Sequence, residues 1–120
     1  NFVETMLSLA GKGESIKVVD DQIGSPTYAP DLAQATLALV ESKKPHGIYH
    51  RTNSGSTSWH GFAKEIFTVF NREVDLEPCT TAEFPRPAKR PAFSVLRSTK
   101  LEPMRSWQEA LHEYVAHSHG

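Results

Sequence analysis

Residues 18–32, VVDDQIGSPTYAPDL, join an apolar pair to two adjacent carboxylates, a Gly-Ser-Pro-Thr turn and the start of a helix. Pro30 suits the first turn of a helix because it has no backbone N–H to leave unpaired, and Asp31 complements the positive end of the helix dipole. The preceding residues 15–20, SIKVVD, read as a strand. A polar turn at 22–27, between a strand and a helix, is where ligands often bind, although a simple capping turn explains it equally well.

Helical and strand-like patterns alternate along the rest of the chain. Apolar residues fall at helical spacing in 2–10, 30–40, 59–70 and 107–115, and the third of these helices is predicted to turn its apolar face to the core. Ser58 is placed to cap that helix, and Ser106 with Glu109 forms a capping-box pattern before the last one. Strands are predicted at 15–20, 47–53, 74–80 and 93–96. This alternation favours an α/β fold. The predicted core face of the third helix comprises Trp59, Phe62, Ala63, Ile66, Phe67 and Phe70.

Composition places the chain among globular proteins. Its 120 residues are 38% hydrophobic and 22% charged, which predicts a single unit over residues 1–120. A formal net charge of −1 argues against nucleic-acid and membrane binding, because both need a broad cationic surface. Cys79 is the only cysteine, so no internal disulfide can form and the cytoplasm is the predicted compartment. The first residues resemble no signal peptide and lack an initiating Met, which hints at a fragment.

The carboxylates and histidines do not have the spacing of a metal site. Counted from Asp20, an EF-hand loop would need Gly at its sixth position and Glu at its twelfth, where this chain has Ser25 and Asp31. The histidines at 112, 117 and 119 do not share one helical face. We therefore predict no metal site, a turn organised by Asp20 and Asp21, and a solvated, frayed tail at 117–120.

Motifs of a self-contained active site are missing from the sequence. It has no Gly-x-Gly-x-x-Gly phosphate loop, no tyrosine followed four residues later by a lysine, and no Gly-x-Ser-x-Gly elbow. We therefore assign no catalytic residue and expect no cofactor on this chain.

A proline-rich basic loop is predicted at residues 84–91, FPRPAKRP. Arg86, Lys89 and Arg90 place three cations within five residues on a backbone that prolines stiffen. Such a group can bind a diphosphate. A solvated basic loop is the alternative; a polyproline recognition segment is less favoured because the prolines lack Pro-x-x-Pro spacing.

Taken in order, six segments resemble the carboxy-terminal part of the dTDP-4-dehydrorhamnose reductases. They are NFVETML, VVDDQIGSPTYAPDLA, GIYHRTNSGSTSW, FAKEIF, RPAKRPAFSVL and SWQEAL. The most specific pieces are the Asp-Gln-x-Gly-x-Pro-Thr loop at 21–27 and the Arg-Pro-x-x-Ser segment at 90–94. The resemblance covers nearly the whole chain.

The resemblance implies part of an extended short-chain dehydrogenase/reductase, a Rossmann-type fold whose amino-terminal half binds NADPH and carries the catalytic residues. The present chain would bind the dTDP-sugar whose 4-keto group is reduced, and its partner would be its own amino-terminal domain. Asn1 and Arg90 match positions that approach the nucleotide diphosphate, while Gln22 and Thr27 match positions flanking the cleft.

The same resemblance bears on assembly. Some relatives form dimers bridged by magnesium, but the matching places, Pro30 and the region of His117, carry no carboxylate, so the metal is not expected and a homodimer stays open. The predicted strand at 47–53 would have lost its neighbour in such a piece. We therefore expect the isolated chain to be unstable or to pair with a second copy.

Two other functions remain open from the sequence. One is a non-catalytic homologue such as the regulatory subunit of methionine adenosyltransferase. The other is an epimerase or dehydratase acting on another nucleotide sugar, although such relatives usually carry an Arg-Asp segment in place of the loop at 21–27.

Overall fold

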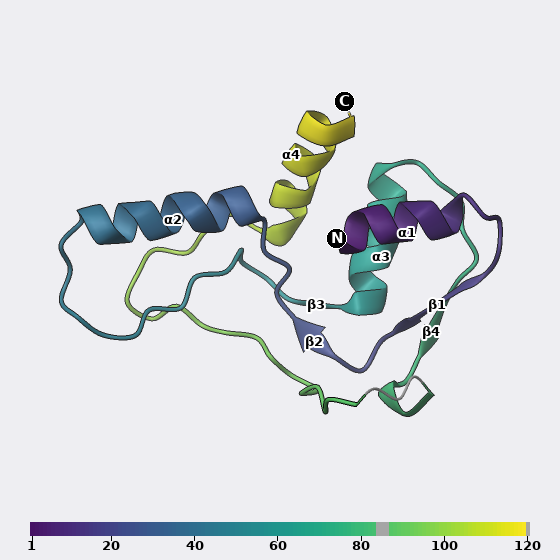
Figure 1. Cartoon of the computed structure of the whole chain (residues 1–120), viewed down its shortest axis with the longest axis horizontal. Helices are drawn as coiled ribbons and strands as arrows, with labels where there is room; N and C mark the ends of the chain where they lie inside the picture. The colour runs from purple at the N-terminus through teal and green to yellow at the C-terminus, as the bar shows by residue number, and fades with distance from the viewer. Residues whose placement is uncertain (84–86, 120) are drawn as a thin grey trace. The chain divides into compact units, whose positions relative to one another are not determined.

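The computed structural model describes residues 1–83 and 87–119, which belong to two compact units of the chain (Figure 1). The first unit contains Asn1–Gly24 and Thr57–Ser94. The second contains Ser25–Ser56 and the chain from Val95 onward. The prediction that residues 1–120 act as one unit stays a prediction.

The first unit packs helices against short strands. Its helices are α1 (Phe2–Ala10) and α3 (Trp59–Val69), and a 3-10 turn, η1, follows at Thr81–Glu83. Strand β1 (Ile16–Val19) pairs in parallel with β4 (Leu76–Cys79), and β2 (Ile23–Gly24) pairs antiparallel with β3 (Thr57–Ser58).

Buried and exposed side chains alternate along β1, and its buried face forms part of the core of the first unit. Ile16 and Val18 are buried and Lys17 is exposed, as expected for a strand with one face on a core. Ile66 of α3 is 0% exposed, but Trp59 is 40% exposed, so its predicted place in the core is wrong. Trp59 lies instead at the start of α3, where its ring contacts Phe2 at 5.0 Å between centroids. The buried apolar side chains of this unit are Val3, Met6, Ile16, Val18, Ala63, Ile66, Phe67 and Cys79.

The second unit contains helices α2 (Ala29–Glu41) and α4 (Trp107–His119). Ser106 caps α4 by accepting a hydrogen bond from Glu109 N at 3.1 Å, as the capping box predicts. Trp107, Ala110 and Leu111 of α4 are buried. Helix α4 continues to His119, and Gly120 lies outside the described residues. The predicted fraying of residues 117–120 stays a prediction.

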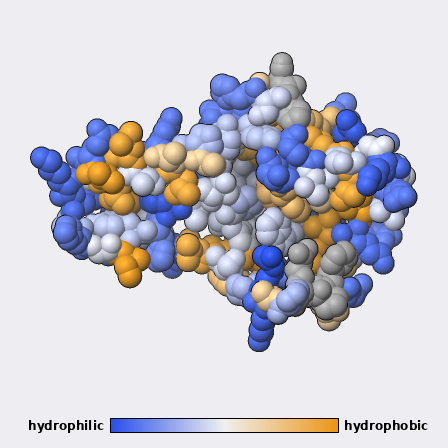
Figure 2. Space-filling model, in the orientation of Figure 1, coloured by the Kyte–Doolittle hydropathy of each residue, from blue (hydrophilic) through white to orange (hydrophobic). Residues whose placement is uncertain are grey.

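Helix α2 has no buried residue in the described structure, although its sequence is amphipathic. Leu37 and Val40 are 60% and 70% exposed. Figure 2 shows apolar surface over this helix. The expectation that the isolated chain is unstable or pairs with a copy is consistent with such exposure and stays a prediction.

The predicted α/β class with about four helices is confirmed, but two predicted strands are wrong. Residues 47–53 form no strand, because no described segment pairs with them. The next residue, Ser54, makes an isolated bridge to Ser106. At 93–96 only Phe93 makes a bridge.

Residues 87–91 lie outside helices and strands, and 84–86 fall outside the described residues, so the predicted loop at 84–91 stays a prediction. No described helix is both long and apolar enough to cross a membrane.

Candidate functional site

Asp20 and Asp21 have structural partners in the first unit. Ser58 Oγ donates to Asp20 Oδ1 at 2.5 Å, and Thr81 N donates to both carboxylate oxygens of Asp21 at 3.0 Å. Hydrogen bonds from the Thr81 side chain and backbone lower the pKa of Asp21. No group of three metal-ligating side chains occurs within the described ranges. The interpretation that these carboxylates organise the turn is confirmed.

Gln22, a predicted substrate-binding residue, is buried beside the same threonine. Its Nε2 donates to Thr81 Oγ1 at 3.1 Å, and that hydroxyl in turn donates to Asp21 Oδ1. Only 9% of Gln22 is exposed, so its amide holds the turn against η1. Its predicted role at the substrate stays a prediction.

The two most specific sequence motifs meet at Ile23. Its N–H donates to Ala92 O at 2.7 Å, and Ser94 N donates to Ile23 O at 2.8 Å. At Gly24 a Cβ atom would lie 3.0 Å from Ser94 Oγ, so glycine permits the close approach. These bonds fix the segment that follows Arg90 against the turn.

The predicted diphosphate-binding residues lie in different parts of the first unit's chain. Lys89 and Arg90 are exposed, and neither forms an ion pair with a carboxylate among residues 1–83 and 87–119. Arg86 lies outside the described residues. Asn1 caps α1 by accepting a hydrogen bond from Glu4 N at 2.9 Å. The common role of these four residues at a diphosphate stays a prediction.

Thr27 lies in the second unit, where a buried asparagine holds its turn. Thr27 Oγ1 donates to Ser25 O at 3.1 Å and accepts from Asn53 N at 3.3 Å. Asn53 Oδ1 accepts from Tyr28 N at 2.7 Å, at the start of α2. Asn53 is 0% exposed. Thr27 therefore has a structural partner, and its predicted contact with substrate stays a prediction.

An ion-paired cluster supports the same turn at the first residues of α2. Arg105 Nε and Nη2 each donate to Asp31 at 2.8 Å, and Nη2 also reaches Glu113 Oε2 at 2.9 Å. Asn53 Nδ2 donates to Asp31 Oδ2 at 2.8 Å. Hydrogen bonds from Arg105 lower the pKa of both carboxyls, and the two carboxylates raise the pKa of Arg105.

Sequence reasoning missed this cluster. The sequence indicates Asp31 only as a complement to the helix dipole, and nothing in the spacing shows that a residue 74 positions later reaches it. The capping box at 106–109 is the nearest available signal, because it places Arg105 next to Ser106, the residue that caps α4.

The Arg105 cluster predicts a pH dependence of stability. The pKa values of Asp31 and Glu113 are lower in the folded chain than their ordinary values of 3.8 and 4.5. The two carboxylates therefore stabilise the folded chain at any pH above those ordinary values. This stabilisation is lost as the pH falls through the lower pKa values of the folded chain. The thermal midpoint should therefore fall on acidification, and Arg105→Gln should flatten that fall. Circular dichroism melts from pH about 7 to about 3 would measure it.

The exposed Arg97, which has no ion pair with a described carboxylate, offers the matched control. Arg97→Gln should leave the pH dependence of the thermal midpoint as it is in the unmodified chain. Equal slopes for Arg105→Gln and the unmodified chain would contradict the assigned role of the cluster.

Comparison with known proteins is consistent across sequence and structure. A family model described as the RmlD substrate binding domain matches residues 1–119. Over 119 residues the chain is 46% identical to the spore coat polysaccharide biosynthesis protein SpsK of Bacillus subtilis, with 96% of the chain and 41% of SpsK covered. It is 43% identical over 119 residues to a Streptomyces antibioticus protein named "Probable dTDP-4,6-dihydroxy-2-methyloxan-3-one 4-ketoreductase", with 94% and 40% covered.

A solved structure extends the likeness to the fold. The dTDP-4-dehydrorhamnose reductase of Bacillus anthracis, in complex with NADP, superposes with a TM-score of 0.92 at 40% identity, covering 98% of the chain and 43% of that protein. The chain thus spans less than half the length of these three proteins. The predicted resemblance to the dTDP-4-dehydrorhamnose reductases is confirmed. This chain belongs to the RmlD substrate-binding domain family.

Proposed function

We propose that this chain is the sugar-nucleotide-binding portion of an NADPH-dependent dTDP-4-dehydrorhamnose reductase. The observation that carries the proposal is the family match over residues 1–119. The reaction would add a hydride to the 4-keto group of the dTDP-sugar, and the remainder of the protein would supply the nicotinamide and the acid. This chain would supply binding and orientation.

The first unit offers the features that a diphosphate needs. Arg90 precedes a segment whose backbone is fixed to Ile23, so the cation sits on an anchored stretch of chain. Lys89 adds a second exposed charge beside it. Guanidinium groups bind phosphate oxygens in a bidentate manner, which makes Arg90 the main proposed contact.

The amino-terminal half of the reductase is the proposed partner domain and the place of the cofactor. This sequence has no glycine-rich phosphate loop, so its own residues do not fit a dinucleotide, and no step is assigned to NADPH on this chain. A homodimer and a cytoplasmic location are further parts of the proposal.

Arg90→Ala tests the diphosphate contact. The substitution should weaken the binding of dTDP by about 1 to 3 kcal/mol, because a charge-assisted hydrogen bond is lost. Calorimetric titration of dTDP into the full-length protein measures the change. Arg72→Ala, an exposed arginine of the same unit that forms no ion pair with a described carboxylate, should leave the affinity unchanged. An unchanged affinity in Arg90→Ala would remove Arg90 from the site.

A reductase for a different dTDP-4-keto sugar is the second candidate function. Its support is the relative at 43% identity whose name describes a 4-ketoreductase of another dTDP-sugar. The non-catalytic regulatory subunit and the epimerase or dehydratase are weaker alternatives, because the relatives compared with the chain include reductases. Rates with several dTDP-4-keto sugars and NADPH would separate the two reductases.

A further inference from the structure

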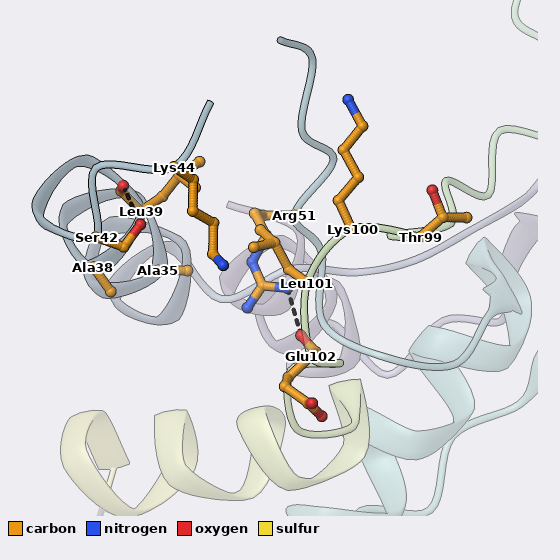
Figure 3. A pocket seen from close by; sticks show the side chains of 10 residues that line it. All are labelled: Ala35, Ala38, Leu39, Ser42, Lys44, Arg51, Thr99, Lys100, Leu101 and Glu102. Carbon is orange, nitrogen blue, oxygen red and sulfur yellow. Dashed lines mark hydrogen bonds between the residues drawn. The ribbon is translucent and has the colours of Figure 1, made fainter. Parts of the chain in front are cut away.

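A pocket of about 570 Å³ lies in the second unit, between α2 and the segment at 99–102 (Figure 3). All of its lining residues belong to that unit, whereas Arg90, the main proposed diphosphate contact, belongs to the first. Small-molecule sites typically have volumes of about 300 to 1,000 Å³. The pocket is therefore large enough for a small organic ligand.

Two cations converge in this pocket. The Lys44 ammonium and the Arg51 guanidinium line it together, and Figure 3 shows them pointing into the same space. Like charges repel, and no carboxylate in the described part of the chain pairs with either of them. The Glu102 carboxylate points away from the guanidinium in Figure 3. An anion placed between the two cations would relieve the repulsion.

The guanidinium is held in position by the backbone. Arg51 Nη1 donates to Glu102 O at 2.7 Å, which fixes the side chain without neutralising its charge. Among the described residues this is the one hydrogen bond recorded for the guanidinium, which has further N–H groups that a ligand could use. Lys100 is different: its Nζ donates to Ile48 O at 3.0 Å and lies 4.9 Å from the centre of the Tyr49 ring. Lys100 keeps its charge as well, but its ammonium points away from Lys44 and Arg51 in Figure 3, so two of the three lining cations face the same space.

Apolar side chains form the wall beside these cations. Ala35, Ala38 and Leu39 lie on one face of α2 because they are three and four residues apart, and Leu101 lines the pocket from the other segment. Alanine side chains leave room that larger residues would fill. Such a wall suits the carbon skeleton of a ligand whose anionic end is at Arg51.

We propose that this pocket binds a small organic phosphate monoester. A phosphate monoester carries a charge of about −1.5 to −2 at neutral pH, which matches the two cations, whereas a carboxylate carries a single negative charge. Arg51 and Lys44 bind the phosphate oxygens, and the apolar wall contacts the organic group. None of the residues that line this pocket is among the proposed sugar-nucleotide contacts.

Phenyl phosphate titrated into the full-length protein, followed by calorimetry and by backbone amide NMR shifts, tests the proposal. We expect saturable binding, amide shifts at α2 and 99–102, and affinity above that of inorganic phosphate and of benzoate. Arg51→Gln and Lys44→Gln should each weaken binding about ten-fold. Lys43→Gln removes the neighbouring charge, which does not line the pocket, and should leave the affinity unchanged.

A second variant tests the wall without changing charge. Ala38→Leu keeps a strong helix former at an exposed position but fills the pocket, so it should remove the preference for phenyl phosphate over inorganic phosphate. The proposal is overturned by unsaturable binding, by equal affinity for benzoate, or by an unchanged affinity in Arg51→Gln. Amide shifts confined to the first unit would also overturn it.

Discussion

Asn53→Ala is expected to lower the free energy of unfolding by about 3 kcal/mol. The Asn53 side chain accepts from Tyr28 N and donates to Asp31 and to Arg105 O. Because Asn53 is 0% exposed, water cannot replace these bonds without opening the structure. Each buried partner left unpaired costs about 1 to 3 kcal/mol. Equilibrium unfolding in urea measures the loss.

Gln34→Ala is the matched control for Asn53→Ala. Gln34 carries the same amide group at an exposed position of α2, so its truncation should change the free energy of unfolding by less than about 0.5 kcal/mol. Equal effects of the two substitutions would contradict the role of Asn53 as the residue that holds the turn before α2.

Ile66→Ala is expected to destabilise the first unit by about 2 to 5 kcal/mol. Ile66 is 0% exposed on α3, the helix that packs against both β1 and α1. Truncation removes apolar contacts and leaves a cavity that the surrounding side chains fill only in part. Urea unfolding monitored by far-ultraviolet circular dichroism measures the change.

Ile66→Val is the conservative substitution with which the effect of Ile66→Ala is compared. Ile66→Val removes a single methylene and should cost about 1 kcal/mol, so the two variants together should show a graded loss. A cost below about 1 kcal/mol for Ile66→Ala would indicate that α3 is not packed as described.

Helix starts are predictable from the sequence because their signals are local. Pro30 marks the first turn of α2, Ser58 caps α3 through Gly61 N at 3.0 Å, and Ser106 caps α4. Spacing alone does not predict that the turn at 21–27 pairs with the segment at 90–94. The resemblance marks both motifs, and only the structure shows that Ile23 joins them.

Long-range partners cannot be predicted in the same way. The pattern at 47–53 has strand composition, but strand formation depends on a neighbour that the described residues do not supply. Arg105 and Asn53 reach Asp31 across 74 and 22 positions, and no periodicity encodes such contacts. The resemblance identifies Gln22 and Thr27 as site residues, and both prove to have intramolecular partners that spacing alone could not indicate.

A reductase assay of the full-length protein tests the proposed function. With dTDP-4-dehydro-L-rhamnose and NADPH, we expect loss of NADPH absorbance and formation of dTDP-L-rhamnose. We also expect Arg90→Ala to lower the rate at limiting substrate concentration. Absence of NADPH oxidation, together with absence of dTDP binding by calorimetry, would contradict the assignment of this chain to sugar-nucleotide binding.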